Sequence, residues 1–374
     1  MKIIHLITTL DVGGAEKHLL WLGAAQVARG HEVGVVWFKG QGSLEEEFRL
    51  GGMDVHHVPM QSARQTLSAA AALRALLRAL APDVLHTHLL KADALGAWVA
   101  PQAGVPVIVS SKHNDERALL KRSVGWVHGF LTRRVHRVIA LSDHVARFVS
   151  RHGHVPMSKI TRIYYGVDAE ALLPARSRAE VRSELGLAED APVLICVGRL
   201  APQKDHPTLL DALSRLPESV TLLVVGGDPF GDGEARLQAL TEQLGLGCRA
   251  RFLGIRHDVP DLLAASDLFV LPSLWEGLGL VFLEAMAVKL PVVASHVSAI
   301  PEVVADGVSG WLVPPGNPGA LADAIQSGLE NDADRLARGL AGYMRLLERF
   351  ALPAMVERTL TVYTELLTEK EARS

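Results

Sequence analysis

The stretch that decides the fold is Pro272-Ser-Leu-Trp-Glu-Gly-Leu-Gly-Leu-Val-Phe-Leu-Glu-Ala-Met-Ala287. It follows an apolar run of β type, Leu268 to Leu271, and it continues into a run that is typical of a helix. The pattern predicts the loop at the C-terminal end of a strand, followed by the first turns of a helix. In open α/β sheets, ligands bind at such loops.

Two carboxylates in this stretch predict a site for a polyol or a phosphate. Glu276 lies in the loop, and Glu284 is expected about two turns into a helix that begins near Gly279. Carboxylates accept hydrogen bonds from vicinal hydroxyls, and free N–H groups at a helix start favour an anion. The alternative is that both are solvated charges, although apolar residues on all sides of Glu284 leave little room for an exposed helix face.

Length and composition favour two α/β domains. The chain has 374 residues, of which 49% are hydrophobic and 5% aromatic, and this suits buried parallel sheets covered by helices. Its net charge of −3 gives no general electrostatic case for nucleic acid, so no nucleic-acid partner is expected.

The cysteines and the N-terminus favour a cytoplasmic protein. Cys196 lies in an apolar strand-like run, so it and Cys248 are expected as free thiols in a reducing compartment. The opening run, Met1 to Ile7, is too short for a signal peptide and suits a first buried strand. Because no apolar run reaches spanning length, we expect at most peripheral contact with the inner face of the cell membrane.

Strand-like and helix-like runs alternate along the chain. Strands are expected at 2–8, 33–38, 55–58, 84–86, 105–110 and 137–141, and again at 193–197, 220–225, 251–253, 268–271, 291–294 and 311–313. Helices are expected at 15–29, 44–50, 67–80, 91–100, 116–135 and 143–151, and through most of the chain after Pro318. This βα alternation predicts doubly wound parallel sheets, the α/β class.

The alternation pauses once, which predicts a domain junction. The pause lies around Ile163 to Asp168, and the polar stretch 174–182 follows it. We therefore expect one Rossmann-like domain at 1–168 and a second at 169–350, facing each other across a cleft. The segment 351–374 is expected to be a helix that returns to the first domain.

Two cations follow the first strand of the second domain. Arg199 and Lys204 lie in the segment Val197 to Asp205, at a strand end where a diphosphate would need positive charge. Ordinary solvated cations are the alternative. In a parallel sheet this loop should neighbour the loop of Glu276, which favours the binding site.

The loop after the first strand carries Gly13 and Gly14, directly before a helix. Both glycines can take positive φ and bring backbone N–H groups toward a diphosphate or an acceptor. The spacing does not match the G-x-G-x-x-G pattern, so a tight turn without a ligand remains an equal alternative.

Histidines follow two strands of the first domain. His113 projects at the edge of the expected cleft, where it can contact a sugar hydroxyl or the reacting centre, or be structural. His86 and His88 share one face of a strand end, as metal ligands would. No carboxylate or cysteine cluster accompanies them, so no metal site is expected.

A basic segment spans 117–137 and interleaves cations with apolar residues. The cations Lys121, Arg122, Arg133, Arg134 and Arg137 alternate with Trp126, Val127, Phe130 and Leu131. Such a segment can lie on an anionic membrane surface, or it can be an ordinary helix with a solvated face.

Taken together, these residues resemble the retaining GT-B glycosyltransferases of family 4, the group 1 type. The strongest match is the E-x7-E motif from Glu276 to Glu284. Other matching segments are 13–16, 29–33, 198–204, 300–304 and 310–314, in the family's order along nearly the whole chain.

The resemblance implies a GT-B fold and residue roles in the second domain, which would bind the donor. Arg199 and Lys204 would neutralise the leaving diphosphate in place of a metal ion. Glu284 would hold the ribose hydroxyls. Glu276 would contact the donor sugar, with the backbone of Gly277, Leu278, Gly279 and Leu280 beside it.

The resemblance also implies an acceptor-side role for the first domain. Gly13 and Gly14 would close on the phosphates or the acceptor, and His113 would contact the donor sugar near its anomeric carbon. No second-face nucleophile is evident, so same-face attack assisted by the departing phosphate is the expected mechanism. Tyr164 to Asp168 is the expected hinge.

The implied reaction moves a hexose from a nucleotide-sugar, UDP-linked rather than GDP-linked, to a glycan or lipid-linked acceptor in cell-surface polysaccharide biosynthesis. No cofactor is expected. The alternatives are a nucleotide-sugar epimerase of the same architecture, and a non-catalytic nucleotide-sugar-binding partner. A phosphorylase would need a lysine-held pyridoxal phosphate, for which the sequence offers no convincing site.

Three positions depart from the family's pattern. Tyr165 stands where the hinge motif commonly has Asn, and Ser298 begins a pair that is frequently Gly-Gly. Lys289 replaces a common Gly after the motif helix, where a left-handed backbone would cost roughly 1 kcal/mol or more.

Overall fold

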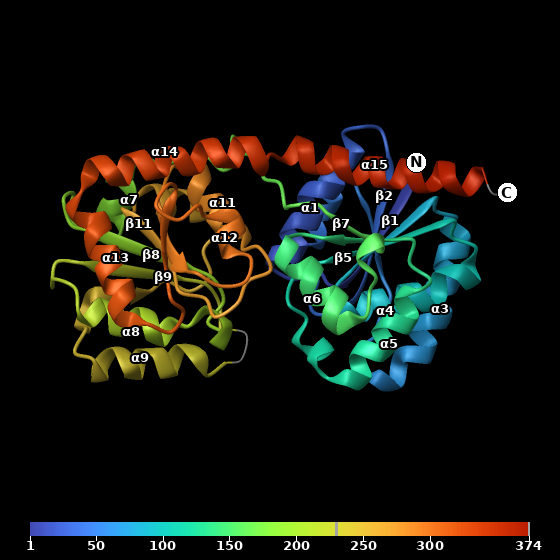
Figure 1. The fold of residues 1–374 in the computed structure, drawn as a ribbon, viewed down its shortest axis with the longest axis horizontal. Helices are drawn as coiled ribbons and strands as arrows, with labels where there is room; N and C mark the ends of the chain where they lie inside the picture. The colour runs from blue at the N-terminus through green and yellow to red at the C-terminus, as the bar shows by residue number, and fades with distance from the viewer. Residues whose placement is uncertain (229–230, 373–374) are drawn as a thin grey trace. The chain divides into compact units, whose positions relative to one another are not determined.

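The computed structural model describes residues 1–228 and 231–372, which form two compact units (Figure 1). Unit 1 is Met1–Gly166 together with the segment from Leu352, and unit 2 is Val167–Ala351. The boundaries thus fall at 167 and 351 rather than at 169 and 350, and the segment after 351 belongs to the first unit.

Unit 1 is built on a seven-stranded sheet whose strand order is β3-β2-β1-β4-β5-β6-β7. All its pairings are parallel. The strands are β1 (Lys2–Thr9), β2 (Glu32–Lys39), β3 (Asp54–His57), β4 (Val84–His88), β5 (Val107–Lys112), β6 (Arg137–Ala140) and β7 (Ile160–Arg162). The chain winds outward from β1 in one direction and from β4 in the other, so the switch point lies between these two strands.

Helices cover both faces of this sheet. The helices are α1 (Gly14–Val27), α2 (Glu45–Leu50), α3 (Thr66–Leu80), α4 (Leu90–Ala103), α5 (Arg122–Thr132), α6 (Asp143–Gly153) and α15 (Leu352–Glu371). One core packs side chains of α3, α4 and α6 against Leu6 and Leu85. On the opposite face, α1 and α15 pack against alternate residues of the same strands, Ile3 and Val84. This alternation is what a doubly wound sheet requires.

Unit 2 is built on a six-stranded parallel sheet, in the order β10-β9-β8-β11-β12-β13. The strands are β8 (Val193–Val197), β9 (Thr221–Val225), β10 (Ala250–Phe252), β11 (Leu268–Leu271), β12 (Val292–Ser295) and β13 (Gly310–Val313). The helices are α7 (Arg178–Glu184), α8 (His206–Ser214), α9 (Gly233–Gln243), α10 (Val259–Ala264), α11 (Leu280–Ala287), α12 (Ile300–Val303), α13 (Pro318–Glu330) and α14 (Asp332–Arg349). Its switch point lies between β8 and β11.

Two features of unit 1 differ from the prediction. β7 was not predicted, because its three residues, Ile160–Arg162, carry only one apolar side chain. The segment predicted as one helix over 116–135 is a 3₁₀ turn, Arg117–Leu120, followed by α5. The break occurs at Lys121, whose φ of −74° and ψ of 113° are extended. Among the described residues, no helix is long and apolar enough to span a membrane.

Candidate active site

The two loops at the switch point of unit 2 meet through an ion pair. Lys204, in the short turn after β8, places its Nζ 2.6 Å from Oε1 of Glu276, in the loop after β11. The backbone joins the loops as well, because Leu274 N–H donates to the carbonyl of Gln203 at 2.8 Å. The predicted neighbourhood of these two loops is therefore confirmed. It follows from β8 and β11 being adjacent strands.

Glu276 is buried, with 5% of its surface exposed, and several donors surround its carboxylate. Besides Lys204, Ser273 Oγ donates to Oε1 at 2.8 Å, and Gln203 Nε2 lies 3.4 Å from Oε2. Gln203 Nε2 also donates to the carbonyl of Trp275 at 2.8 Å. Sequence reasoning missed Ser273 and Gln203, although both flank residues that it had singled out. A buried carboxylate with this many partners is held in one orientation.

Arg199 lies in the same loop as Lys204, between β8 and the turn, and its side chain is exposed. The Lys204 side chain is 12% exposed. The loop therefore presents one partly buried cation, which is already paired, and one cation open to solvent. Both can meet an anion that approaches this end of the sheet.

Helix α11 begins at Leu280, so Glu284 lies a little over one turn into it, not two. Glu284 is 6% exposed. Gly279 caps the helix with φ 85°, a left-handed conformation that favours glycine, and a Cβ there would lie 2.5 Å from the Phe282 ring. Leu278 and Leu280 are buried on either side of this cap. The helix start thus has no side-chain cap, and the buried carboxylate of Glu284 follows it within the same helix.

In unit 1, neither glycine of the loop before α1 has positive φ, contrary to expectation. Gly13 is extended, with φ −166°, and Gly14 is the first residue of α1. A Cβ at Gly13 would lie 2.3 Å from Oε2 of Glu16, whereas one at Gly14 would meet nothing within 4 Å. Gly13 therefore leaves room for the carboxylate of Glu16, whose Oε1 accepts a hydrogen bond from Thr9 at 2.6 Å.

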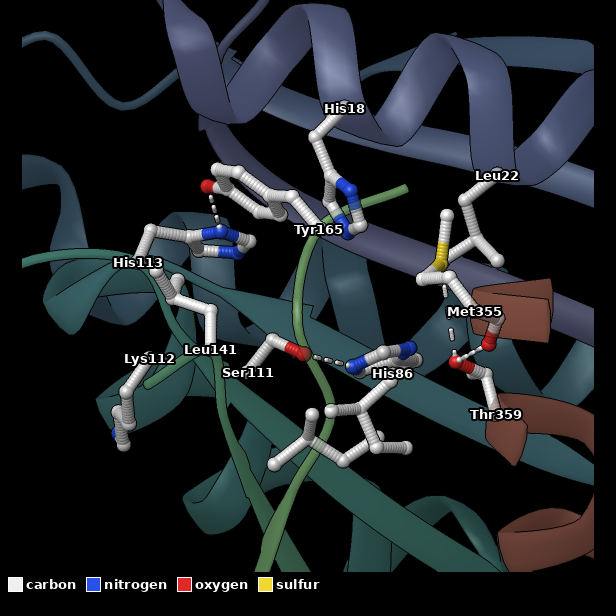
Figure 2. A pocket seen from close by; sticks show the side chains of 12 residues that line it. His18, Leu22, His86, Ser111, Lys112, His113, Leu141, Tyr165, Met355 and Thr359 are labelled. Atoms are coloured by element: carbon white, nitrogen blue, oxygen red, sulfur yellow. Dashed lines mark hydrogen bonds between the residues drawn. The ribbon is translucent and has the colours of Figure 1, made fainter. Parts of the chain in front are cut away.

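His113 follows β5, and both of its ring nitrogens already have protein partners. Nδ1 lies 2.6 Å from the hydroxyl of Tyr165, and Nε2 lies 2.9 Å from Nδ1 of His88. Figure 2 shows the Tyr165 hydroxyl directed at the His113 ring. His113 is 8% exposed, and burial lowers its pKa from 6.5 to about 4, so the ring is neutral at neutral pH.

The structure adds a third histidine to the pair that the sequence singled out. His5, His86 and His88 are fully buried, and a ligand atom from each lies within 4.8 Å of the others. His5 was missed because it comes from β1, although its position in a buried strand was a usable signal. No carboxylate belongs to this group, so a divalent cation there would have no balancing charge.

The basic segment forms an exposed surface in unit 1. On α5, the side chains of Trp126, Val127 and Phe130 are 62%, 60% and 57% exposed. The face of α5 that packs inward carries instead Gly125 and His128. The exposed cations around these apolar side chains are Lys121, Arg122, Arg133 and Arg134. An outward-facing helix surface that is both apolar and basic is typical of contact with a membrane or another molecule.

Comparison with known proteins covers both units. Residues 12–171 match the family described as Glycosyltransferase Family 4, and residues 177–344 match Glycosyl transferases group 1. One relative is the UDP-Gal:alpha-D-GlcNAc-diphosphoundecaprenol alpha-1,3-galactosyltransferase of Escherichia coli. It is 33% identical over 243 residues, which are 62% of this chain and 62% of that protein.

Another relative is the D-inositol 3-phosphate glycosyltransferase of Mycolicibacterium smegmatis, 32% identical over 309 residues, 78% of this chain and 69% of that protein. Among solved structures, Anabaena HepE in complex with UDP and glucose aligns with a TM-score of 0.89 at 27% identity. The alignment covers 98% of this chain and 100% of that one. HepE in complex with UDP-glucose aligns with a TM-score of 0.88 at 28% identity, over 97% of this chain and 100% of that one.

The chain has two doubly wound units, carries the E-x7-E motif in a loop at a switch point, and matches these proteins along most of its length. It therefore belongs to glycosyltransferase family 4, the group 1 type, whose members have the GT-B fold.

Proposed function

We propose that the protein is a retaining, metal-independent glycosyltransferase that moves a hexose from a UDP-sugar to a glycan or lipid-linked acceptor. The observation that carries the proposal is the Lys204–Glu276 pair at the switch point of unit 2, with Arg199 exposed beside it. A diphosphate and a sugar hydroxyl are the two chemical groups that this pair is suited to bind.

Binding of a diphosphate would change the contacts that Lys204 and Glu276 make. Nζ of Lys204 can leave Oε1 of Glu276 for a phosphate oxygen, which frees that carboxylate oxygen to accept a sugar hydroxyl. Arg199 would add a second cation from the solvent side. Together they would supply the positive charge for which other transferases use a divalent cation.

The other residues of unit 2 take roles around this charge pair. Glu284 would accept hydrogen bonds from the ribose hydroxyls. The backbone of Gly277 to Leu280, at the start of α11, would lie beside the phosphates and the sugar. In unit 1, Gly14 and Gly13 would lie against the phosphates or the acceptor, and the open space at the Gly14 Cβ position supports this. His113 would lie beside the donor sugar.

UDP is favoured as the donor nucleotide by the names of similar proteins. HepE has been solved with UDP, with UDP and glucose, and with UDP-glucose. The E. coli relative carries UDP-Gal in its name, and its acceptor name includes diphosphoundecaprenol. These names support a UDP-hexose donor and a lipid-linked acceptor, and an acceptor of this kind would fit cell-surface polysaccharide biosynthesis.

Retention would follow from attack on the same face that the diphosphate leaves. The bond between the anomeric carbon and the phosphate oxygen breaks, and the acceptor oxygen bonds to that carbon. The acceptor's proton passes to the departing phosphate oxygen, which Lys204 and Arg199 stabilise. His113, neutral and with a pKa of about 4, is a weak base, so it would orient the sugar rather than take this proton.

We also propose that the exposed surface of α5 rests on the anionic inner face of the cell membrane, where a lipid-linked acceptor would be. The cations would bind lipid headgroups, and the Trp126 and Phe130 side chains would enter the interface. Arg133 and Arg134 lie over the Phe130 ring, at 5.9 and 5.7 Å from its centre, which holds charge and apolar surface together. The protein would be cytoplasmic and peripheral.

Product analysis tests the transfer reaction. With UDP-glucose and UDP-galactose as donors and an undecaprenyl-diphosphate-linked sugar as acceptor, we expect an α-linked product in EDTA, with its configuration read from the anomeric coupling constant. An inverted product would contradict the mechanism. Free UDP released with epimerised sugar and no acceptor would identify an epimerase, and binding without any turnover would identify a non-catalytic partner.

Vesicle sedimentation tests the membrane contact. We expect the protein to sediment with phosphatidylglycerol vesicles at low salt and to be released from them at high salt. It should not sediment with phosphatidylcholine vesicles. The double variant Trp126→Ser and Phe130→Ser should lose this binding. Leu340→Ser is the matched control, because Leu340 is also an apolar helix residue, 51% exposed, in unit 2. An equal loss of vesicle binding in the Leu340→Ser control would contradict the proposed membrane contact.

A further inference from the structure

Three histidines of unit 1, on β1, on β4 and directly after β5, form an unbroken hydrogen-bonded line. Nδ1 of His5, on β1, lies 3.0 Å from Nε2 of His88, on β4, and His88 Nδ1 lies 2.9 Å from His113 Nε2. Gln26 closes one end, with Oε1 2.8 Å from His5 Nε2. The Tyr165 hydroxyl closes the other, 2.6 Å from His113 Nδ1. We call these five residues the histidine line.

A line of neutral imidazoles has a direction. Each neutral ring has one N–H donor and one acceptor nitrogen, so fixing the donor at one end fixes every ring between the ends. Burial lowers the pKa of His5 and of His113 to about 4, and that of His88 well below 6.5. At neutral pH the rings are therefore uncharged, and all three share one order of donors and acceptors.

Both ends favour the same direction. The Tyr165 hydroxyl keeps its proton, because burial and the charge of Glu16 raise its pKa well above 10, and His113 Nδ1, 2.6 Å away, is the acceptor that the structure places beside it. His113 Nε2–H then donates to His88, and His88 Nε2–H donates to His5. His5 Nε2–H finally donates to Oε1 of Gln26, the oxygen that the structure places there. The reverse order would leave the buried Tyr165 proton to find another acceptor.

Metal binding explains this cluster less well than the histidine line does. His86, the third member of the metal-like group, bonds outside the line, with Nδ1 at the Tyr363 hydroxyl and Nε2 2.7 Å from Ser111 Oγ. Every ring nitrogen of His5, His86 and His88 thus has a protein partner. A metal would have to displace several of these bonds in a fully buried group to which the described residues contribute no carboxylate.

The Tyr165 end of the line borders a small cavity (Figure 2). The cavity has a volume of about 10 Å³, which is room for one water-sized group. His18 stacks on Tyr165 beside it, with ring centroids 4.2 Å apart, and its buried Nδ1 has no partner within the described chain. Buried polar atoms rarely lack a partner, so the cavity fits a single hydroxyl group.

We propose that the histidine line holds His113 protonated at Nε2, so that its Tyr165 end offers only lone pairs and takes one hydroxyl of the substrate sugar as a hydrogen-bond donor. Tyr165 is then the residue that contacts the hydroxyl. His113, His88, His5 and Gln26 are positioning residues, because they act on the sugar through Tyr165. The inference rests on the proposed function, which places the donor sugar beside His113.

The tautomers can be read directly in the unmutated protein. In ¹⁵N spectra of the histidine side chains at pH 7, we expect His5, His88 and His113 all to carry their proton at Nε2. A proton at Nδ1 of any of them, or a charged ring, overturns the proposal. This measurement needs neither substrate nor turnover, so it judges the histidine line even if the proposed function fails.

A matched pair of variants tests the link to the sugar. His88 and His86 lie two residues apart on β4 and are both fully buried, but only His88 belongs to the line. We expect His88→Val to let His113 populate both tautomers and to weaken UDP-glucose binding by about tenfold, the loss of one hydrogen bond. His86→Val should leave the His113 spectrum unchanged, and UDP affinity should stay the same in both variants.

Two further variants test the proposal. His88→Gln, which keeps one donor and one acceptor, should recover part of the UDP-glucose affinity. Tyr165→Phe should weaken UDP-glucose binding, but not UDP binding, as much as His88→Val does. Equal effects of His86→Val and His88→Val would overturn the inference, since both would then act through packing alone. If the unmutated protein binds neither UDP nor UDP-glucose, the proposed function fails and the spectra alone judge the line.

Discussion

The two units place opposite chemistry at the same topological position. In unit 1 the switch point between β1 and β4 carries uncharged histidines that are fully buried. In unit 2 the switch point between β8 and β11 carries the Lys204–Glu276 ion pair, with Arg199 exposed beside it. Neutral rings can be buried completely because their hydrogen bonds satisfy them, whereas cations that must receive an anion stay near solvent. In the proposed function, the same sheet topology would support one positioning site and one electrostatic site.

The largest effect is expected for a variant that removes the partly buried cation at the switch point of unit 2. We expect Lys204→Ala to lower kcat by about 10²–10³-fold, because the leaving diphosphate loses a preorganised cation. Steady-state kinetics with a saturating donor measures it. Arg236→Ala, at a cation that is 77% exposed in a surface ion pair of the same unit, is the control and should change kcat little. Equal kcat values for the Lys204 variant and the unmutated enzyme would show that Lys204 does not stabilise the leaving diphosphate.

Acid should destabilise unit 1 before unit 2. His5 and His113 have folded pKa values of about 4 against 6.5 unfolded, so below pH 6.5 the unfolded chain binds more protons. Stability is complete above pH 7 and is lost as pH falls from 6.5 to 4, by up to about 3 kcal/mol for each ring.

Hydrogen exchange between pH 7 and pH 4.5 measures this for each unit. In unit 2, burial lowers the pKa of His206 to about 4 in the same way, but that unit has no comparable cluster of buried histidines in its described part. We expect amide protection to fall first in β1, β4 and β5. Earlier loss of protection in β8 and β11 would contradict the comparison.

A variant of Glu284 separates nucleotide binding from catalysis in unit 2. We expect Glu284→Ala to weaken UDP affinity by about 10–100-fold, since it removes hydrogen bonds between a carboxylate and ribose hydroxyls. Calorimetric titration measures the change, and Glu242→Ala, at an exposed carboxylate in α9 of the same unit, is the control. A Glu284 variant with unchanged UDP affinity but a lower kcat would assign the residue to catalysis instead.

The smallest effect concerns backbone strain beside the charged switch point. Ser298 has φ 52°, and its neighbour Ala299 donates its N–H to the carbonyl of Glu276 at 3.4 Å. We expect Ser298→Gly to raise the free energy of unfolding by about 1 kcal/mol, because glycine adopts this conformation without strain. Denaturant unfolding measures it, and a lower stability would show that the Ser298 side chain contributes more than the strain costs.

Most strands of both sheets were predictable, because each is a short apolar run between turn signals. The meeting of the loops of Lys204 and Glu276 was predictable for the same reason, since topology alone makes β8 and β11 neighbours. Lys289 has a left-handed backbone, with φ 60°, as expected at a position where the family commonly has glycine.

The histidine line was not predictable. His5, His88 and His113 lie 83 and 25 residues apart, and their contacts depend on strand register and on rotamers that no local pattern encodes. The break at Lys121 was also hidden, because Lys121 and the residues before it, Arg117 to Leu120, are good helix formers. The backbone of Gly13 was not predictable, because the sequence does not distinguish a glycine in extended backbone from one with positive φ.

A metal-free diphosphate site is tested most directly by calorimetric titration of UDP into the unmutated protein and into Lys204→Ala, each with and without EDTA. We expect binding that EDTA leaves unchanged and that weakens at least tenfold in the variant, because Lys204 would take the place of a metal ion at the diphosphate. Binding that requires a divalent cation, or that is equally tight in both proteins, would contradict a metal-free diphosphate site at the switch point of unit 2.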